Sequence, residues 1–353
     1  GADLLNHPPT LDTLGAAIGW FDAALSVDPD YAAAHAGKCR TFAWLLSETR
    51  DSGYVSRAEA ECADALELNP NLDIVHEALG HMYIETGRHS EAAAAFREAL
   101  RINDRNVDAM VGLSSVYRLE NRPDEAEEIL HTAVGLQPGN WNIYSSLGMF
   151  YFRQGRYAEA AEQFAEVVSI TPSYMRAYGN LGSSYMMAGD FPEALATFRR
   201  SLDVKADRLT YMNLGMVNYY LGHYDEAEAA IRESIAMEPR QHLVWSNLGD
   251  ILFVAGKPGE ANEAYQTAEE LIEERLAINP NDPLMQMDHA YVHAMLGDRD
   301  QALLKISQAL DAAPDDPYAS YYAGLIHHHF GETGPALDAL ERAVAKGHST
   351  VLL

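Results

Sequence analysis

Apolar residues recur at steps of three and four along the chain, and short breaks rich in Gly and Asp interrupt them. This spacing places apolar side chains on one stripe of an α-helix, so the pattern predicts a series of amphipathic helices. Leu147 and Tyr151 lie on one such stripe, and Phe164 and Val167 lie on the next, after a break at Gly155. The sequence therefore predicts pairs of helices joined by short turns.

Glycine and proline mark the expected ends of these helices. Gly155 is expected to end the first helix of its pair in the left-handed conformation, which glycine adopts without a steric penalty. Pro172 is expected to stop the second helix, because proline cannot donate the backbone hydrogen bond of a continuing helix. The same stop is expected at Pro70, Pro138, Pro239, Pro280 and Pro314.

One short block recurs through the chain. It reads "YGNLGSSYMMAGDFPEA" from residue 178, "YMNLGMVNYYLGHYDEA" from 211 and "WSNLGDILFVAGKPGEA" from 245. Related blocks start at residues 76, 110, 144, 286 and 320, so successive starts lie 33 or 34 residues apart, with one interval of 41. A fixed period in this range is typical of a helical solenoid. Two units, around "SETRDSGYVS" and "TAEELIEERLAINP", are seven residues longer, which is close to two helical turns.

A glycine follows the leucine in most of these blocks. We expect it to let two helices approach closely, with an alanine of the partner helix filling the other half of the contact, as for Gly182 and Ala194. Replacing Gly182 with Leu should overpack the pair and cost roughly 1–3 kcal/mol. The same pairing is expected at Gly80, Gly148, Gly215, Gly249 and Gly324 with Ala92, Ala160, Ala227, Ala261 and Ala336.

In its helix-turn-helix unit, its order of small and aromatic core positions and its terminal proline, the sequence resembles tetratricopeptide repeat proteins over about residues 10 to 347. The resemblance implies an all-α fold, an α-α superhelix of stacked antiparallel helix pairs, and a single solenoid over residues 1–353. The first unit is expected to be truncated to one helix. The implied units are 10–31, 32–72, 73–106, 107–140, 141–174, 175–207, 208–241, 242–282, 283–316 and 317–347.

The charge balance limits the partners. With 25 Lys and Arg against 52 Asp and Glu, the formal net charge is −27, which disfavours nucleic acid and anionic membranes and favours a basic or neutral partner. No stretch approaches 18 uninterrupted apolar residues, so we expect a soluble protein, with the cytoplasm slightly favoured. The start "GADLLNHPPT" and the end "KGHSTVLL" suggest a fragment of a larger protein.

Three successive units carry an asparagine one place before the core leucine, at Asn180, Asn213 and Asn247. In such a superhelix this place faces the concave side, where a primary amide can pair with the backbone of an extended peptide. The arrangement resembles the asparagine ladder of O-linked N-acetylglucosamine transferases and of importin-like armadillo solenoids. The alternative is that "NLG" only fills a structural position. The matching places elsewhere hold Ala78, Gly112, Ser146, Asp288 and Tyr322.

The neighbouring positions of the same face hold soft and aromatic side chains. Methionine adapts to varied apolar partners, so these positions could supply the apolar contacts that three amides cannot. Tyr219 and Tyr220 are consecutive and cannot share one core stripe, so at least one should be exposed. The alternative is that about half of these side chains pack between units. The predicted lining consists of Met149, Phe152, Met186, Met187, Met216, Tyr219, Tyr220 and Phe253, with Met212 and Met295 beside it.

Several histidines and two cysteines could bind a metal ion or form a disulfide, but we expect them to be structural residues of the core. His289 and His293 lie one turn apart, and His327 holds the place of His293 in the next unit; three imidazoles could meet there, but satisfied core histidines are the expected outcome. Cys39 and Cys62 are expected to be small buried thiols, although a disulfide, or a metal site with His35, stays an alternative. In "HEALGH" at 76–81 the two histidines are five apart, which does not fit a zinc-protease helix.

These observations predict a scaffold that binds a protein or an extended, partly apolar and basic peptide on its concave face. We expect no catalytic residue, no cofactor and no metal; the abundant Glu residues are expected on outward faces. Weaker resemblances point to the tetratricopeptide regions of bacterial multidomain regulators or, alternatively, to the substrate-targeting region of a transferase such as a glycosyltransferase. A self-association module is a further alternative, because exposed apolar surface could pair with a second copy.

Overall fold

The computed structural model describes residues 8–348, and their regular elements are α-helices. The chain divides into two compact units, and the boundary along the sequence falls between Ala177 and Tyr178. The first unit holds α1 (Leu11–Val27), α2 (Ala32–Thr49), α3 (Gly53–Leu68), α4 (Asp73–Glu85), α5 (His89–Ile102), α6 (Val107–Leu119), α7 (Pro123–Leu136), α8 (Trp141–Arg153) and α9 (Tyr157–Ile170).

Helix α10 (Met175–Ala188) contains the boundary, and the second unit continues from it. This unit holds α11 (Phe191–Val204), α12 (Arg208–Tyr220), α13 (Tyr224–Met237), α14 (His242–Val254), α15 (Pro258–Ile278), α16 (Pro283–Met295), α17 (Arg299–Ala312), α18 (Pro317–His329) and α19 (Thr333–Ala345).

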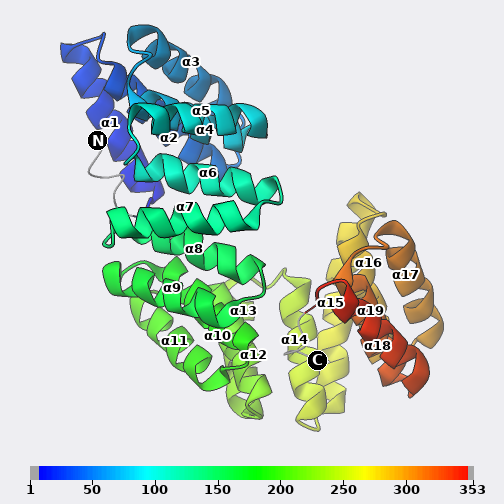
Figure 1. The fold of residues 1–353 in the computed structure, drawn as a ribbon. Helices are drawn as coiled ribbons and strands as arrows, with labels where there is room; N and C mark the ends of the chain where they lie inside the picture. Colours follow the sequence, from blue (N-terminus) through cyan, green and yellow to red (C-terminus); the bar gives the residue numbers. More distant parts are fainter. Residues whose placement is uncertain (1–7, 349–353) are drawn as a thin grey trace. The chain divides into compact units, whose positions relative to one another are not determined.

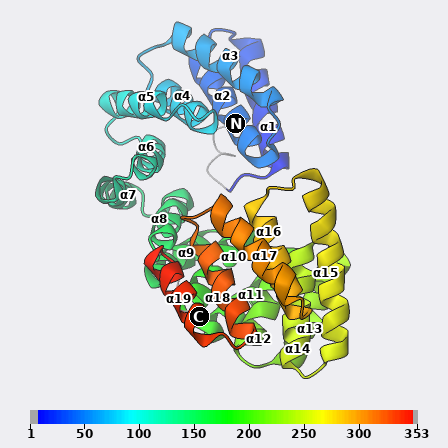
Figure 2. The same ribbon diagram turned by 90° about the vertical axis from the view of Figure 1, so that its right-hand side faces the viewer.

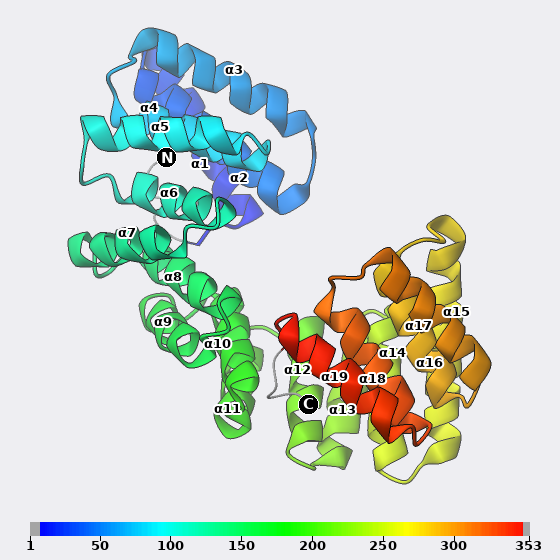
Figure 3. The same ribbon diagram turned by 45° about the vertical axis from the view of Figure 1, so that its right-hand side comes forward.

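Consecutive helices form antiparallel pairs within each unit, such as α4 with α5 and α8 with α9 in the first (Figure 1). In the second unit α16 pairs with α17 and α18 with α19 (Figure 3). The seven extra residues of the 242–282 segment lengthen α15, which runs as one continuous helix past its neighbours (Figure 2). Of the described residues, no helix is apolar over a length that could cross a membrane.

Most turns inside the pairs follow the predicted glycine rule; the turn after α2 is an exception, with Arg50 in the left-handed conformation at φ +58°. Gly155 has φ +73°. Asn121 takes the same place after α6 with φ +57°, and asparagine, like glycine, tolerates this left-handed conformation. The prolines after the second helices have an additional role: their carbonyl groups accept hydrogen bonds from the next helix. Tyr144 Oη donates to Pro138 O at 2.9 Å, and Trp245 Nε1 donates to Pro239 O at 2.8 Å.

The glycine after the core leucine packs differently from our expectation. A Cβ atom added to Gly182 would lie 2.6 Å from the ring of Phe198, four residues beyond Ala194, and one added to Gly148 would lie 2.9 Å from the ring of Phe164. The expected alanines contribute only in part: the backbone oxygens of Ala227 and Ala336 lie 3.3 Å from a Cβ added to Gly215 and to Gly324, whereas the nearest atoms belong to larger side chains. Glycine makes room for a large apolar side chain of the partner helix, because only a missing Cβ leaves enough space for a ring.

Two further expectations fail in the first unit: the free thiols of Cys39 and Cys62 and, at a single position, the outward-facing Glu residues. The Sγ atoms of Cys39 and Cys62 are joined in a disulfide that links α2 to α3, so these residues are not free thiols. Glu77 does not face outward: it is buried, and its Oε1 lies 2.8 Å from Arg40 Nη1, which also contacts Asp108. Burial raises the pKa of Glu77 to about 7. Sequence pattern could not show this, because the ion pair joins residues of three different helices.

Candidate functional site

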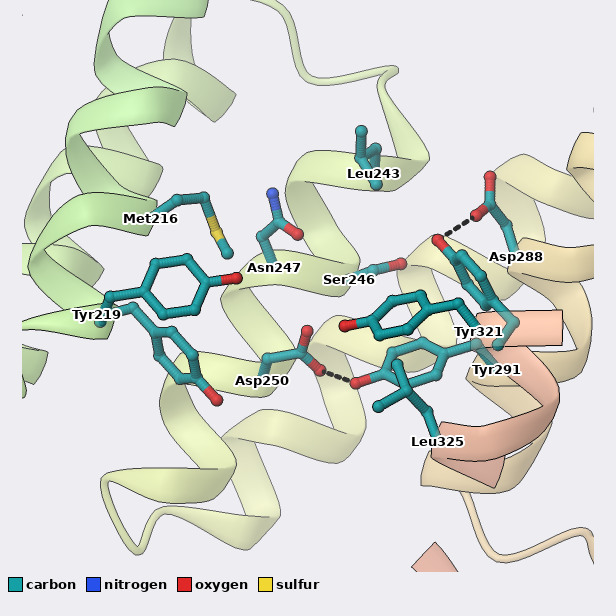
Figure 4. Close-up of a pocket in the computed structure, with 12 residues that line it drawn as sticks. Met216, Tyr219, Leu243, Ser246, Asn247, Asp250, Asp288, Tyr291, Tyr321 and Leu325 are labelled. Atoms are coloured by element: carbon teal, nitrogen blue, oxygen red, sulfur yellow. Dashed lines mark hydrogen bonds between the residues drawn. The ribbon is translucent and has the colours of Figure 1, made fainter. Parts of the chain in front are cut away.

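Four helices of the second unit, each the first of its pair, line a pocket of about 350 Å³. They are α12, α14, α16 and α18, and Figure 4 shows their side chains converging on one space. Tyrosine and aspartate dominate the lining. It consists of Met216, Tyr219, Tyr220, Leu243, Ser246, Asn247, Asp250, Asp288, Tyr291, Tyr321, Tyr322 and Leu325.

Asp250 lies at the centre of a tyrosine cluster. Tyr265 Oη and Tyr291 Oη both donate to its Oδ1, each at 2.7 Å. Burial raises the pKa of Asp250 to about 6, although both hydrogen bonds act in the opposite direction. The other oxygen, Oδ2, accepts no hydrogen bond from the described residues, and Figure 4 shows it pointing into the pocket.

Asp288 is buried, and both of its oxygens are engaged. Tyr322 Oη donates to Oδ1 at 2.9 Å, and His242 Nε2 lies 2.9 Å from Oδ2. Burial, followed by the nearby charge of Asp288, raises the pKa of Tyr322 well above its usual value. Asp288 therefore holds its neighbours in place, whereas Asp250 keeps one oxygen available for a ligand.

The tyrosine rings support one another. Tyr220 stacks on Phe191 with ring centroids 5.0 Å apart, and Tyr291 meets Tyr322 edge to face at 5.8 Å. Burial raises the pKa of Tyr321 to about 12, so this phenol stays neutral in the physiological range. Fixed, neutral aromatic rings beside a carboxylate form the environment that attracts an organic cation.

A second, more apolar hollow of about 450 Å³ adjoins the pocket. It shares Tyr219, Asp250, Tyr291 and Leu325 with the pocket. Its own lining consists of Phe253, Val254, Met295, His328 and His329. Phe253 is 49% exposed and Val254 is 45% exposed, so apolar surface lies directly beside the acidic pocket.

The sequence-predicted residues fall into three groups. The first group lines the hollows: Met216, Tyr219, Tyr220 and Asn247 line the pocket, and Phe253 lines the adjoining hollow. The second group belongs to α10 and α12 of the same unit without lining either hollow, and comprises Asn180, Asn213, Met186 and Met187. The third group, Met149 and Phe152, lies on α8 of the first unit, where Met149 is 37% exposed.

Within the second group, Asn180 and Asn213 are half-buried. Met186 packs against the core formed by Ala194, Phe198 and Val217, so part of its side chain serves the helix interface. Tyr220 is 37% exposed, which confirms that the two consecutive tyrosines do not share one core stripe.

Sequence reasoning missed Asp250, Tyr291 and Tyr321. Asp250 lies three places after Asn247, and Tyr291 lies three places after Asp288, so both follow the predicted inward position by one helical turn. That spacing was a usable signal. The bond between Asp288 and Tyr322, which hold the asparagine place in successive units, could also have been expected from complementary donors and acceptors.

The expected satisfaction of the core histidines is wrong for one of them. His289 is 5% exposed, and neither of its ring nitrogens has a hydrogen-bond partner among the described residues. Burial lowers the pKa of His289 to about 4. His327 does not join it, because His327 Nδ1 lies 2.6 Å from Glu332 Oε2.

Comparison with protein families decides the classification. One tetratricopeptide repeat model matches residues 50–107, 212–283 and 287–349, which is more than half of the chain. Two others match residues 83–147, 142–207 and 173–238. The chain belongs to the tetratricopeptide repeat family. Its proteins are helical scaffolds that bind proteins or peptides and are generally without enzymatic activity.

Individual relatives are distant. Tetratricopeptide repeat protein 7B of Mus musculus is 36% identical over 58 residues, which cover 16% of this chain and only 7% of that protein. A solved tetratricopeptide repeat protein from Parabacteroides merdae has a TM-score of 0.52 at 16% identity, covering 78% of this chain and 95% of that chain. The human IFIT1 dimer with m7Gppp-AAAA has a TM-score of 0.55 at 18% identity, covering 85% and 68%. At these identities the likeness confirms the all-α repeat fold.

Proposed function

We propose that the second unit of this tetratricopeptide repeat protein binds an extended peptide segment that carries a lysine or arginine next to apolar residues. The observation that carries the proposal is Asp250: one carboxylate oxygen is held by two tyrosines, and the other points into the pocket without a partner. A cationic side chain entering the pocket would meet that oxygen and the faces of neutral tyrosine rings.

The adjoining hollow supports the apolar part of the proposal. A side chain next to the basic residue would lie against Phe253 and Val254, which are about half exposed in the unbound protein. Burying one such apolar side chain contributes about 1.5–3 kcal/mol. The net charge of −27 adds long-range attraction for a basic segment and repels phosphate-rich partners.

The magnitudes indicate why an extended segment fits better than a single side chain. A hydrogen bond to a charged group contributes about 1.5–3 kcal/mol, and a cation over a tyrosine ring contributes about 0.5–2 kcal/mol. With one apolar side chain these gains fall short of the roughly 8 kcal/mol of micromolar binding once the ordering cost is subtracted. We therefore include Asn180, Asn213 and Asn247 in the proposal, as amides that pair with the peptide backbone on successive repeats.

The test is selection of binding sequences from a random peptide library, followed by titration of the selected peptides. We expect selected sequences to share one Lys or Arg flanked by apolar residues. Asp250→Asn should weaken their binding at least tenfold, whereas the matched control Glu233→Gln, at an exposed position of α13, should not. Selected peptides without a basic position, or equal binding by Asp250→Asn, would refute the proposal.

The wider setting stays a prediction from sequence resemblance. We propose that the chain acts as the partner-recruiting arm of a larger regulatory protein, with bacterial regulators as the expected source. The role is binding without chemistry: the aspartates and tyrosines of the pocket are proposed to hold a ligand and to transform none.

A further inference from the structure

Three potential metal ligands meet where α15 packs against α16 in the second unit. Glu269 of α15 and His289 and His293 of α16 each offer one donor atom, and the three atoms lie within 4.8 Å of one another. His293 Nδ1 lies 3.3 Å from Glu269 Oε1, and the two imidazole rings have centroids 4.3 Å apart. The two histidines are four residues apart, so both project from one face of α16.

His289 is the observation that points to a ligand. Its side chain is 95% buried, since 5% of it is exposed, and neither ring nitrogen has a hydrogen-bond partner among the described residues. A buried nitrogen without a partner is unfavourable, and native structures rarely keep one without an ion, a water molecule or a functional reason. A metal ion shared with Glu269 and His293 would satisfy the lone pair of one of these nitrogens.

We propose that Glu269, His289 and His293 form a binding site for a divalent transition-metal ion, with Zn²⁺ as the best fit. Two imidazoles and one carboxylate suit Zn²⁺, whereas Ca²⁺ and Mg²⁺ prefer oxygen ligands alone. Donor atoms about 2.1 Å from a tetrahedral Zn²⁺ lie about 3.4 Å apart, which the Glu269–His293 separation already matches. His289 would complete the site by a small side-chain movement, and a fourth position would stay open to water.

The surrounding charges favour a cation on balance. The pKa of Glu269 is raised in part by three nearby negative charges, those of Glu270, Glu273 and Asp298. The same negative charges add to the attraction for a metal ion. The positive charge of Lys305 lowers the pKa of His289 and opposes the binding of a metal ion there. The site would fasten the C-terminal half of α15, the longest described helix, to the first helix of the following repeat.

A second cluster provides an internal contrast. His35, Glu61 and Asp64 in the first unit meet the same distance limit. There, however, His35 Nδ1 contacts Glu61 Oε2 at 2.6 Å, His35 Nε2 contacts Pro29 O at 3.1 Å, and Lys38 also binds Glu61. Because hydrogen bonds and an ion pair already satisfy these groups, we expect no metal there, and His35 becomes the matched control.

The experiment uses the whole chain after removal of metals with a chelator. Zn²⁺ is titrated in competition with a colorimetric chelator, and Co²⁺ is used in parallel because its visible absorption reports the coordination geometry. We expect one equivalent of Zn²⁺ to bind with micromolar affinity or better. Loss of one ligand should weaken binding at least about 100-fold, more than is typical for removing an outer-shell partner.

The variants separate this site from other histidines. Glu269→Gln and His293→Asn are preferred to a change at buried His289, and circular dichroism is used to check that both variants fold. His35→Gln and a variant with His327, His328 and His329 replaced by Gln should bind like the wild type. Absence of saturable Zn²⁺ binding, unchanged affinity in Glu269→Gln and His293→Asn, or loss of binding in either control variant would each overturn the proposal.

Discussion

Replacing Gly249 with alanine should damage both the core and the pocket, because the two share one side chain. A Cβ atom at position 249 would lie 2.4 Å from Cε1 and 2.6 Å from Cδ1 of Tyr265. Tyr265 is completely buried, and its hydroxyl group donates to Asp250. The ring therefore cannot move away without repacking the core and lengthening that hydrogen bond.

The expected size follows from two opposing effects. Overpacking a dense core costs about 1–3 kcal/mol, and replacing glycine by alanine within a helix returns roughly 0.5–1 kcal/mol. With the middle of each range the net destabilisation should be about 1.3 kcal/mol, or a shift of about 0.6 M in the urea midpoint for an m-value near 2 kcal/mol/M. The matched control is Gly259→Ala in α15, where an added Cβ meets no atom within 4 Å; it should be neutral or slightly stabilising.

Urea unfolding followed by circular dichroism measures the effect, and hydrogen exchange over α14 and α15 localises it, because repeat arrays often unfold in parts. A double-mutant cycle with Tyr265→Leu isolates the clash: in that background the cost of Gly249→Ala should largely disappear. If Gly249→Ala unfolds at the same urea concentration as the wild type, the proposed steric role of the glycine column is wrong.

Three further predictions concern the disulfide, the carboxylate of Asp250 and the three asparagines. Replacing Cys39 and Cys62 by Ser should destabilise the α2–α3 region by about 3 kcal/mol, because the disulfide closes a loop between residues 23 apart in sequence. Thermal melts with and without a reducing agent measure this loss of stability. Identical melts would contradict the disulfide. The raised pKa of about 6 makes Asp250 neutral in acid, so affinity for a basic peptide should be highest above pH 6 and should fall, towards tenfold per pH unit, below it. Asp250→Asn should remove this dependence in titrations from pH 4.5 to 8. An unchanged pH profile in the variant would contradict the role of this carboxylate. The triple variant Asn180→Ala, Asn213→Ala and Asn247→Ala should bind selected peptides about 100-fold more weakly if each amide contributes about 1 kcal/mol, and a folded triple variant with full affinity would rule out the ladder.

The repeat fold was accessible from sequence because its determinants are local and periodic. Glycine at 155 and proline at 172 act on their own backbone, and each repeat supplies the same signal again. A tertiary contact has no such redundancy. The disulfide and the buried pairing of Arg40 with Glu77 each occur once, between helices whose facing positions the pattern alone does not fix.

The candidate site was only partly accessible for a related reason. The asparagine column drew attention to the place before the core leucine, and Asn247 lies at the pocket. Asp250 is one turn further along the same helix, where its role depends on tyrosines from α15 and α16. No single repeat contains that cluster, so a comparison of repeats position by position could not assemble it.

Tyr265 shows how a binding pocket can develop from a structural position of the repeat. In other repeats of this chain the side chain that fills the glycine contact is phenylalanine, at 96, 164 and 198, or the aliphatic Ile231 and Leu340. Tyrosine at 265 keeps the ring that the contact requires and adds a hydroxyl group that reaches Asp250 at 2.7 Å. The carboxylate is thereby anchored to a completely buried ring of the repeat core, and its free oxygen is positioned without a loop to hold it. A pocket built in this way makes affinity and stability depend on the same ring.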